Sequence, residues 1–169
     1  MWGTGLYTAS VQQGLRENLV ERIEDPRNEA PQAQQPPQLQ GDAWGILKIP
    51  EIDLDVVVVE GVSPVDLKAG PGHYIQTPFP WEEKGAVGIA GHRTTYGAPF
   101  WSLDELDTGD LISLATEFGV FRYEVSRSLE VEPSALSVLR QTRRSTLVLT
   151  TCSPRFSASR RLIVFADRI

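Results

Sequence analysis

Short apolar runs rich in β-branched and aromatic residues recur along the chain from about residue 42 to its C-terminus, and such runs are typical of β-strands. The strand-like runs are separated by short turns that contain Gly, Pro or Asp. The pattern predicts strands at 44–50, 54–60, 84–92, 110–116, 119–132, 145–151 and 161–169. About seven strands with short connections favour a mainly β fold in which the sheet closes into a barrel, because closure leaves no exposed strand edge.

Before the first predicted strand, the apolar residues repeat with a period longer than that of a strand. Residues 9–24 carry an apolar side chain at every fourth position, which places these side chains on one face of an amphipathic helix. The four residues are Val11, Leu15, Leu19 and Ile23. Two further short helices are expected within the strand-rich region, at 99–106 and at 133–141. Pro133 suits the first turn of the second one.

The segment 25–41, between the first helix and the first strand, is rich in Gln and Pro, and Leu39 is its only large apolar residue. Such a segment cannot bury a core and favours an extended linker. Three regions are therefore predicted: a helical segment at 1–24, the linker at 25–41 and a β-barrel domain at 42–169.

The N-terminal region has two aromatic residues, Trp2 and Tyr7, of the types that are enriched at membrane interfaces. No apolar run approaches the roughly 20 residues that a membrane-spanning helix needs. We interpret residues 1–24 as a juxtamembrane segment whose membrane anchor was removed just upstream of residue 1. The alternative is that Trp2 simply packs on the domain.

The charge balance argues against a nucleic-acid partner. The chain has 16 basic and 22 acidic residues, a formal net charge of −6, whereas binding to phosphates needs a basic face. Glu130 and Glu132 are candidates for a calcium site in principle, but scattered acids are usually solvated. No metal and no cofactor are expected.

Cys152, the single cysteine, follows the predicted strand 145–151. A lone cysteine at a strand end is either a small buried hydrophobic residue or a nucleophile, and a nucleophile needs a partner such as histidine. His92 ends the strand 84–92 and precedes a Thr-Thr-Tyr-Gly loop, which indicates a position at the barrel rim. His73 lies in a Gly- and Pro-rich loop, and we expect it to be structural.

Arg160 and Arg161 follow Cys152 by eight and nine residues, at the start of the last predicted strand. A loop of this length joins neighbouring antiparallel strands, so the start of the last strand is expected to lie beside Cys152. A guanidinium keeps its charge and offers several donors, which suits the oxyanion that develops in acyl transfer. Each feature alone has an ordinary structural explanation, but their combination in this order favours a catalytic site.

Three motifs together resemble the sortases, the cysteine transpeptidases of Gram-positive cell surfaces. They are Ile-Ala-Gly-His-Arg at 89–93, Leu-Thr-Thr-Cys at 149–152 and Arg-Arg-Leu-Ile-Val-Phe-Ala at 160–166. The resemblance covers about residues 42–169. It implies a closed eight-stranded β-barrel with two or three short helices besides the N-terminal one.

The same resemblance implies a His–Cys–Arg active site, here His92, Cys152 and Arg161. Arg161 is preferred to Arg160, because the family's arginine immediately precedes the final apolar strand. Thr151 matches a family position that helps to hold the substrate and the intermediate.

The sequence around His92 resembles the class E sortases of high-GC actinobacteria, which prefer Leu-Ala-X-Thr-Gly signals to Leu-Pro-X-Thr-Gly signals. Tyr96 matches a tyrosine that is associated with this preference. Its hydroxyl could bond the backbone N–H that Ala has and Pro lacks. The alternative is that Tyr96 is only a turn residue before Gly97. Class D is the second choice.

The resemblance implies an enzyme at the extracellular face of the membrane. It would cleave the C-terminal sorting signal of a secreted protein between Thr and Gly, form a thioacyl enzyme at Cys152 and transfer the protein to an amine of a peptidoglycan precursor. The residues leave two alternatives open: an exported cysteine hydrolase, in which water resolves the thioester, and a non-catalytic β-barrel binding module.

Overall fold

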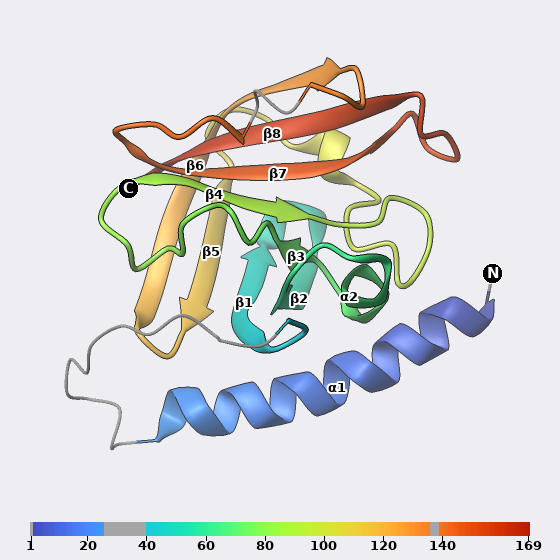
Figure 1. The fold of residues 1–169 in the computed structure, drawn as a ribbon, viewed down its shortest axis with the longest axis vertical. Helices are drawn as coiled ribbons and strands as arrows, with labels where there is room; N and C mark the ends of the chain where they lie inside the picture. The colour runs from blue at the N-terminus through green and yellow to red at the C-terminus, as the bar shows by residue number, and fades with distance from the viewer. Residues whose placement is uncertain (1, 26–39, 136–138) are drawn as a thin grey trace.

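The computed structural model of the chain describes residues 2–25, 40–135 and 139–169. The strands are β1 (Ala43–Ile49), β2 (Leu54–Glu60), β3 (Gly72–His73), β4 (Gly85–Ala90), β5 (Leu111–Thr116), β6 (Gly119–Val131), β7 (Ser145–Ser153) and β8 (Arg160–Arg168). They close into one barrel in the order β1-β2-β3-β4-β7-β8-β6-β5 (Figure 1). The β2–β3 and β4–β7 pairs are parallel, and the others are antiparallel. The predicted mainly β barrel of eight strands is confirmed.

All seven predicted strands form, and each begins and ends within two residues of its predicted bounds. The strand that the residue pattern missed is β3, which is only two residues long and shows no period. It places His73 in the barrel wall beside Ile89, rather than in a loop. A tight turn at residues 117–118 joins β5 to β6 in a hairpin, with Thr116 opposite Gly119.

The helices differ from the prediction more than the strands do. Helix α1 (Trp2–Glu24) begins well before residue 9, and α2 (Pro64–Ala69) was not predicted. The capping box of Ser63 and Asp66 starts α2, a local signal that its few apolar residues do not reveal. The described residues also contain the 3-10 turns η2 (Pro50–Ile52) and η3 (Leu103–Glu105).

The prediction of a helix at 99–106 is wrong, because only the 3-10 turn η3 forms there. Its three apolar residues, Phe100, Leu103 and Leu106, are nevertheless all buried. Packing, not helical periodicity, therefore explains their spacing. The helix expected at 133–141 includes residues 136–138, and the linker expected at 25–41 includes residues 26–39, which lie outside the described residues.

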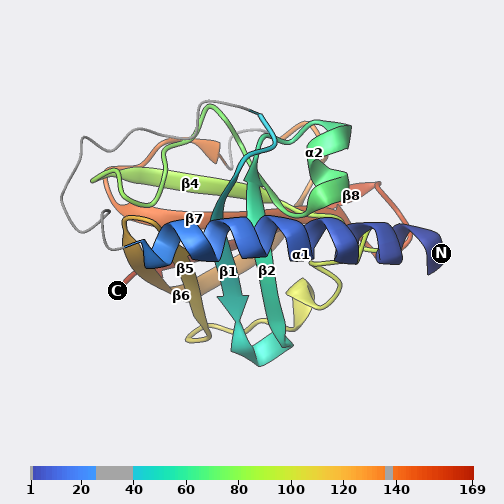
Figure 2. The same cartoon turned by 90° about the horizontal axis from the view of Figure 1, so that it is seen from below.

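Helix α1 lies on the outside of the barrel and crosses β1 and β2 (Figures 1 and 2). The predicted apolar face makes this contact: Leu19 is fully buried and packs in a cluster with Ile46 and Val57, and Leu15 joins its edge. The Gln12 amide also bonds both backbone groups of Val57, at 3.0 Å to the carbonyl and 2.8 Å from the N–H. Among the described helices, none is long and apolar enough to cross a bilayer.

Alternation along β7 separates the barrel interior from its outer face. Leu147 and Leu149 point inward into the main core, whereas Val148 belongs to a separate apolar cluster outside the barrel. Cys152 has the same parity as Val148, so its side chain also points outward. The core therefore fixes β7 so that its last residues present the thiol on the surface of a rigid sheet.

Candidate active site

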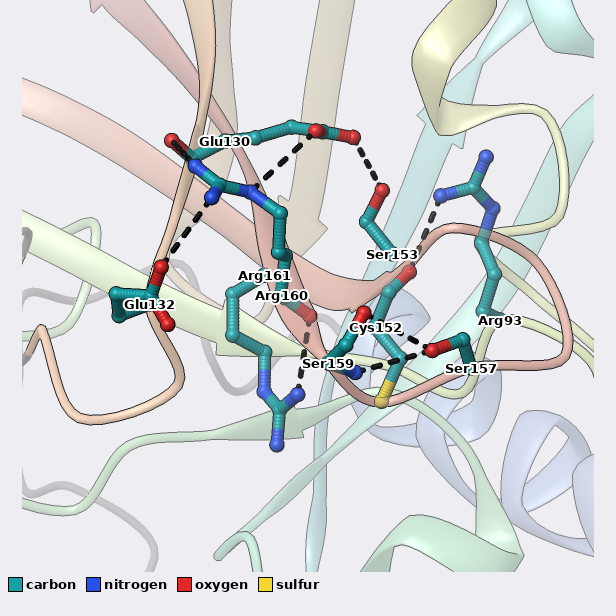
Figure 3. Close-up of polar contacts among 9 residues, drawn as sticks. All are labelled: Arg93, Glu130, Glu132, Cys152, Ser153, Ser157, Ser159, Arg160 and Arg161. Atoms are coloured by element: carbon teal, nitrogen blue, oxygen red, sulfur yellow. Dashed lines mark hydrogen bonds and ion pairs between the residues drawn. The ribbon is translucent and has the colours of Figure 1, made fainter.

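The thiol of Cys152 lies near the end of β7 and is half-buried. Its cross-strand partner on β8 is Arg161. Partners in a sheet project to the same face, and Figure 3 shows the sulfur and the Arg161 guanidinium extending in the same direction from their strands. The geometry therefore brings together two of the three residues that the sequence singled out.

His92 reaches the same end of the sheet from another strand. Because β4 and β7 run parallel with Ala90 opposite Thr150, the residues that follow β4 emerge beside the end of β7. The two strand ends are tied by a backbone hydrogen bond of 3.1 Å from the Gly91 N–H to the Thr150 carbonyl. His92 and Cys152 line one cavity of about 400 Å³, together with Arg93, Thr94, Thr95, Phe156, Ser157 and Ala158.

Partial burial sets the charge state of His92. Desolvation disfavours the imidazolium and lowers the pKa of His92 below its usual 6.5. The ring is therefore mainly neutral at pH 7, which is the form that can accept a proton from a thiol.

We expect the His92 ring to titrate below pH 6.5 and thiol acylation to slow as the pH falls through the lowered pKa of the ring. The sign follows from the lowered pKa: the neutral base persists at neutral pH and is lost only in more acidic solution. NMR of the ring protons measures the titration directly, because the chain has two histidines and the signal missing from His92→Gln identifies the ring. A titration at or above pH 6.5 would contradict the prediction.

The two neighbouring arginines have different surroundings. The Arg161 Nη1 donates to the carbonyls of Ala158 and Arg160, each at 3.1 Å, and Nε and Nη2 make no hydrogen bond within the described part of the chain. Arg160 instead pairs with Glu132 at 3.2 Å and with Glu130 at 3.6 Å (Figure 3). Its charge is already compensated, whereas Arg161 has donors to offer.

Thr151 points to the opposite side of β7 from Cys152. It is buried, and its hydroxyl donates to the Gly91 carbonyl at 2.7 Å. This bond ties the residue before Cys152 to the residue before His92. The substrate contact expected of Thr151 stays a prediction, and the contact observed in the structure is a positioning one.

Tyr96 lies beside His92, with 5.2 Å between the ring centroids. It lines a neighbouring cavity of about 440 Å³ against α1, not the cavity of Cys152. Within the described residues its hydroxyl has no hydrogen-bond partner. Tyr96 and Ala98 both have positive φ, 51° and 44°, around Gly97, so the His92 loop is held in an uncommon backbone conformation.

Arg93 is a residue of this site that sequence reasoning missed. It is 4% exposed and donates to the Cys152 carbonyl at 3.1 Å and to the Trp101 carbonyl at 2.9 Å. Its Nη2 also pairs with Asp104 at 2.8 Å. The only signal in the sequence was its place next to His92, but from there it holds the His92 loop, β7 and the η3 region together.

We expect Arg93→Met to destabilise the fold by about 2 kcal/mol, because it removes the buried guanidinium that donates to the Cys152 carbonyl and one of the two arginines that bond the Trp101 carbonyl and Asp104. Arg155→Met is the matched control. Arg155 bonds the same Trp101 carbonyl and the same Asp104, but its side chain is 32% exposed, so a loss below about 1 kcal/mol is expected. Urea unfolding of the two variants measures the difference, and equal losses would refute the assignment.

His73 is fully buried. Its Nδ1 lies 2.9 Å from a Glu60 carboxylate oxygen and its Nε2 lies 2.9 Å from the Pro78 carbonyl, and its ring stacks on Phe79. It does not line the Cys152 cavity. These contacts agree with the structural role expected for it. Among the described residues, no cluster of His, Cys, Asp or Glu side chains is suited to hold a metal ion.

Comparison with known proteins places this site in a family. Residues 47–169 match the Sortase domain model. The chain is 37% identical to Sortase D of Bacillus subtilis over 134 residues, which cover 76% of this chain and 65% of that protein. The chain therefore spans just under two thirds of that curated relative.

Solved structures agree with the sequence matches. A Sortase D5 transpeptidase of Clostridium perfringens superposes with a TM-score of 0.82 at 29% identity, covering 95% of this chain and 99% of that one. Sortase E1 of Streptomyces coelicolor, solved with a tripeptide in its active site, gives a TM-score of 0.71 at 34% identity over 76% of this chain and 89% of that one. With a family model that matches most of its length, the chain belongs to the sortase family.

Proposed function

We propose that the chain is a cysteine transpeptidase in which Cys152 is the nucleophile, His92 the general acid and base, and Arg161 the main side-chain donor to the oxyanion. The observation that carries the proposal is that the thiol and the imidazole open into one cavity while Arg161 is the cross-strand partner of Cys152. A structural thiol would need neither partner, which argues against a non-catalytic binding module.

In the acylation step, the Cys152 sulfur bonds to the carbonyl carbon of the substrate threonine, and neutral His92 accepts the thiol proton. The carbonyl oxygen becomes an oxyanion. The free Nε and Nη2 of Arg161 are the donors in place to bind it. When the Thr–Gly bond breaks, His92 returns the proton to the glycine nitrogen, and a thioester with Cys152 remains.

In the second step, an amine attacks the thioester carbonyl and His92 accepts a proton from the attacking nitrogen. The carbon–sulfur bond breaks as the new amide forms, and the proton moves to the departing sulfur. The free thiol and the neutral imidazole are then restored. Water in place of the amine would give the hydrolase reaction, so the nature of the product distinguishes the two activities.

The natural substrates that we propose are secreted proteins with a C-terminal Leu-Ala-X-Thr-Gly-like signal, and the proposed acceptor is an amine of a peptidoglycan precursor at the extracellular face of the membrane. Support comes from the family match and from the similarity to a class E sortase with a bound tripeptide.

The test is incubation of the chain with a Leu-Ala-X-Thr-Gly peptide and increasing concentrations of an amine donor, followed by mass spectrometry. We expect the acyl–amine product to replace the hydrolysis product as the amine concentration rises. Hydrolysis product alone at every amine concentration would defeat the transferase proposal.

We propose that Tyr96 contributes to a preference for Ala over Pro in the signal, since it is next to His92 and its hydroxyl is free within the described residues. Replacement of Tyr96 by Phe is expected to lower kcat/KM for the Ala peptide severalfold and to leave the Pro peptide unchanged, because only Ala has a backbone N–H to bond. An unchanged Ala-to-Pro ratio would remove Tyr96 from this role.

A further inference from the structure

The outer face of the sheet continues beyond the active site. Cys152 and Arg161 form one outward-facing cross-strand pair of β7 and β8, and Val148 and Phe165 form another pair of the same parity four residues away. At about 3.3 Å per strand residue, the second pair lies roughly 13 Å from the first. Ile163, between them on β8, belongs to the same outer apolar cluster as Val148 and Phe165.

A second cavity of about 730 Å³ lies over this distant pair. Its apolar lining comes from β4, the second half of β6, β7 and β8, and consists of Ala86, Leu129, Val131, Val148 and Phe165. The segment before β7 closes one side, where the Gln141 side chain accepts a hydrogen bond from the Ala86 N–H at 3.1 Å. This hollow is built on the rigid sheet that carries Cys152.

Three arginines line the same cavity, namely Arg127, Arg140 and Arg144, against a single carboxylate, Asp167. All three are exposed, and within the described parts of the chain none has a carboxylate at ion-pair distance. The Arg127 guanidinium stacks on the Phe165 ring at 4.2 Å from its centroid. A positive rim around an apolar floor is thus present on a chain whose net charge is −6.

The chemistry of the active site gives the direction of a bound peptide. His92 protonates the departing glycine nitrogen, so the glycine side of the scissile bond lies in the cavity that His92 lines, at the ends of β4 and β7. The acyl side must leave in another direction. The outer apolar face leads from Cys152 to the arginine-lined cavity.

We propose that the arginine-lined cavity binds an acidic, partly apolar stretch of the substrate directly N-terminal to its sorting signal. This inference rests on the proposed transpeptidase function. An extended peptide advances about 3.3 Å per residue, so a distance of roughly 13 to 20 Å corresponds to about four to six residues before the threonine. Those positions lie one to three residues ahead of the leucine of the signal, and guanidinium groups favour carboxylates there.

The test compares three peptides that share one Leu-Ala-X-Thr-Gly signal and carry two Glu, two Gln or two Lys residues directly ahead of its leucine. We expect kcat/KM to be about 3- to 10-fold higher for the Glu peptide than for the Gln peptide, and lowest for the Lys peptide, as exposed ion pairs allow. The ratio should collapse in 0.5 M NaCl, because salt screens exposed charges.

The double variant Arg127→Gln, Arg140→Gln should lose the Glu preference and keep its rate on the Gln peptide. Arg122→Gln is the matched control, because Arg122 is an exposed arginine of β6 outside this cavity, and it should keep the preference. Equal kcat/KM for the three peptides, or a preference that survives the double variant, would overturn this inference alone. No turnover of any peptide would overturn the proposed function and this inference with it.

Discussion

Replacement of Cys152 by Ala is expected to abolish thioacyl-enzyme formation and to lower peptide cleavage by at least about 10⁴-fold. The chain contains no second thiol, and a hydroxyl or carboxylate elsewhere cannot take its place at the end of β7. Intact-protein mass spectrometry after mixing with a Leu-Ala-X-Thr-Gly peptide measures the thioester directly, and a cleavage assay measures turnover. Cleavage by the Ala variant at a rate near that of the parent would exclude Cys152 as the nucleophile.

Alkylation supplies the control for this result. Because Cys152 is half-buried rather than sealed in the core, iodoacetamide should modify the native chain once, and more slowly after His92→Ala. The Cys152→Ala chain should remain unmodified and should unfold at the same temperature as the parent. Loss of both activity and folding would instead indicate that the thiol supports the core.

The barrel was predictable because most of its strands are long, and each packs one face against the core of the barrel. The run Leu147-Val148-Leu149 is apolar throughout, because the two leucines face the main core and Val148 faces the outer cluster, and a short apolar run of this kind is typical of a buried strand. The two-residue strand β3 has no period, and α2 begins at a capping box rather than at an apolar stripe. In both cases the structure depends on side-chain and tertiary contacts that a periodic pattern does not record.

The three candidate catalytic residues were predictable for a different reason: each stands at the end or start of a strand, and strand order brings those positions together. What the sequence did not disclose is the direction of the neighbouring side chains. Thr151 turns inward to bond Gly91, and Tyr96 lines the cavity next to α1. Arg93 went unrecognised because a buried arginine is identified by the carbonyl groups that surround it, and those belong to distant segments.

Replacement of Arg161 by Ala is expected to lower kcat/KM by about 10²- to 10³-fold, the usual consequence of removing a donor to an oxyanion. A Lys at this position should recover only part of the rate, since it supplies the charge without the forked donors. Steady-state kinetics on the signal peptide measures the loss. The effect should appear in the acylation step and in the aminolysis step, because a tetrahedral oxyanion forms in each, and kcat/KM reports the acylation step.

Arg160→Ala is the matched control for this prediction, one residue away and on the opposite face of β8. Its removal breaks exposed ion pairs with Glu130 and Glu132, so it should change kcat/KM by less than about fivefold. Alkylation distinguishes a role of Arg161 in binding the oxyanion from a role in stabilising the thiolate. The Cys152 thiolate displaces iodide from iodoacetamide, and this reaction forms no oxyanion. If Arg161 binds the oxyanion, alkylation of the Arg161→Ala variant slows by less than about tenfold. Equal losses in alkylation and acylation would mean that Arg161 acts on the thiolate instead.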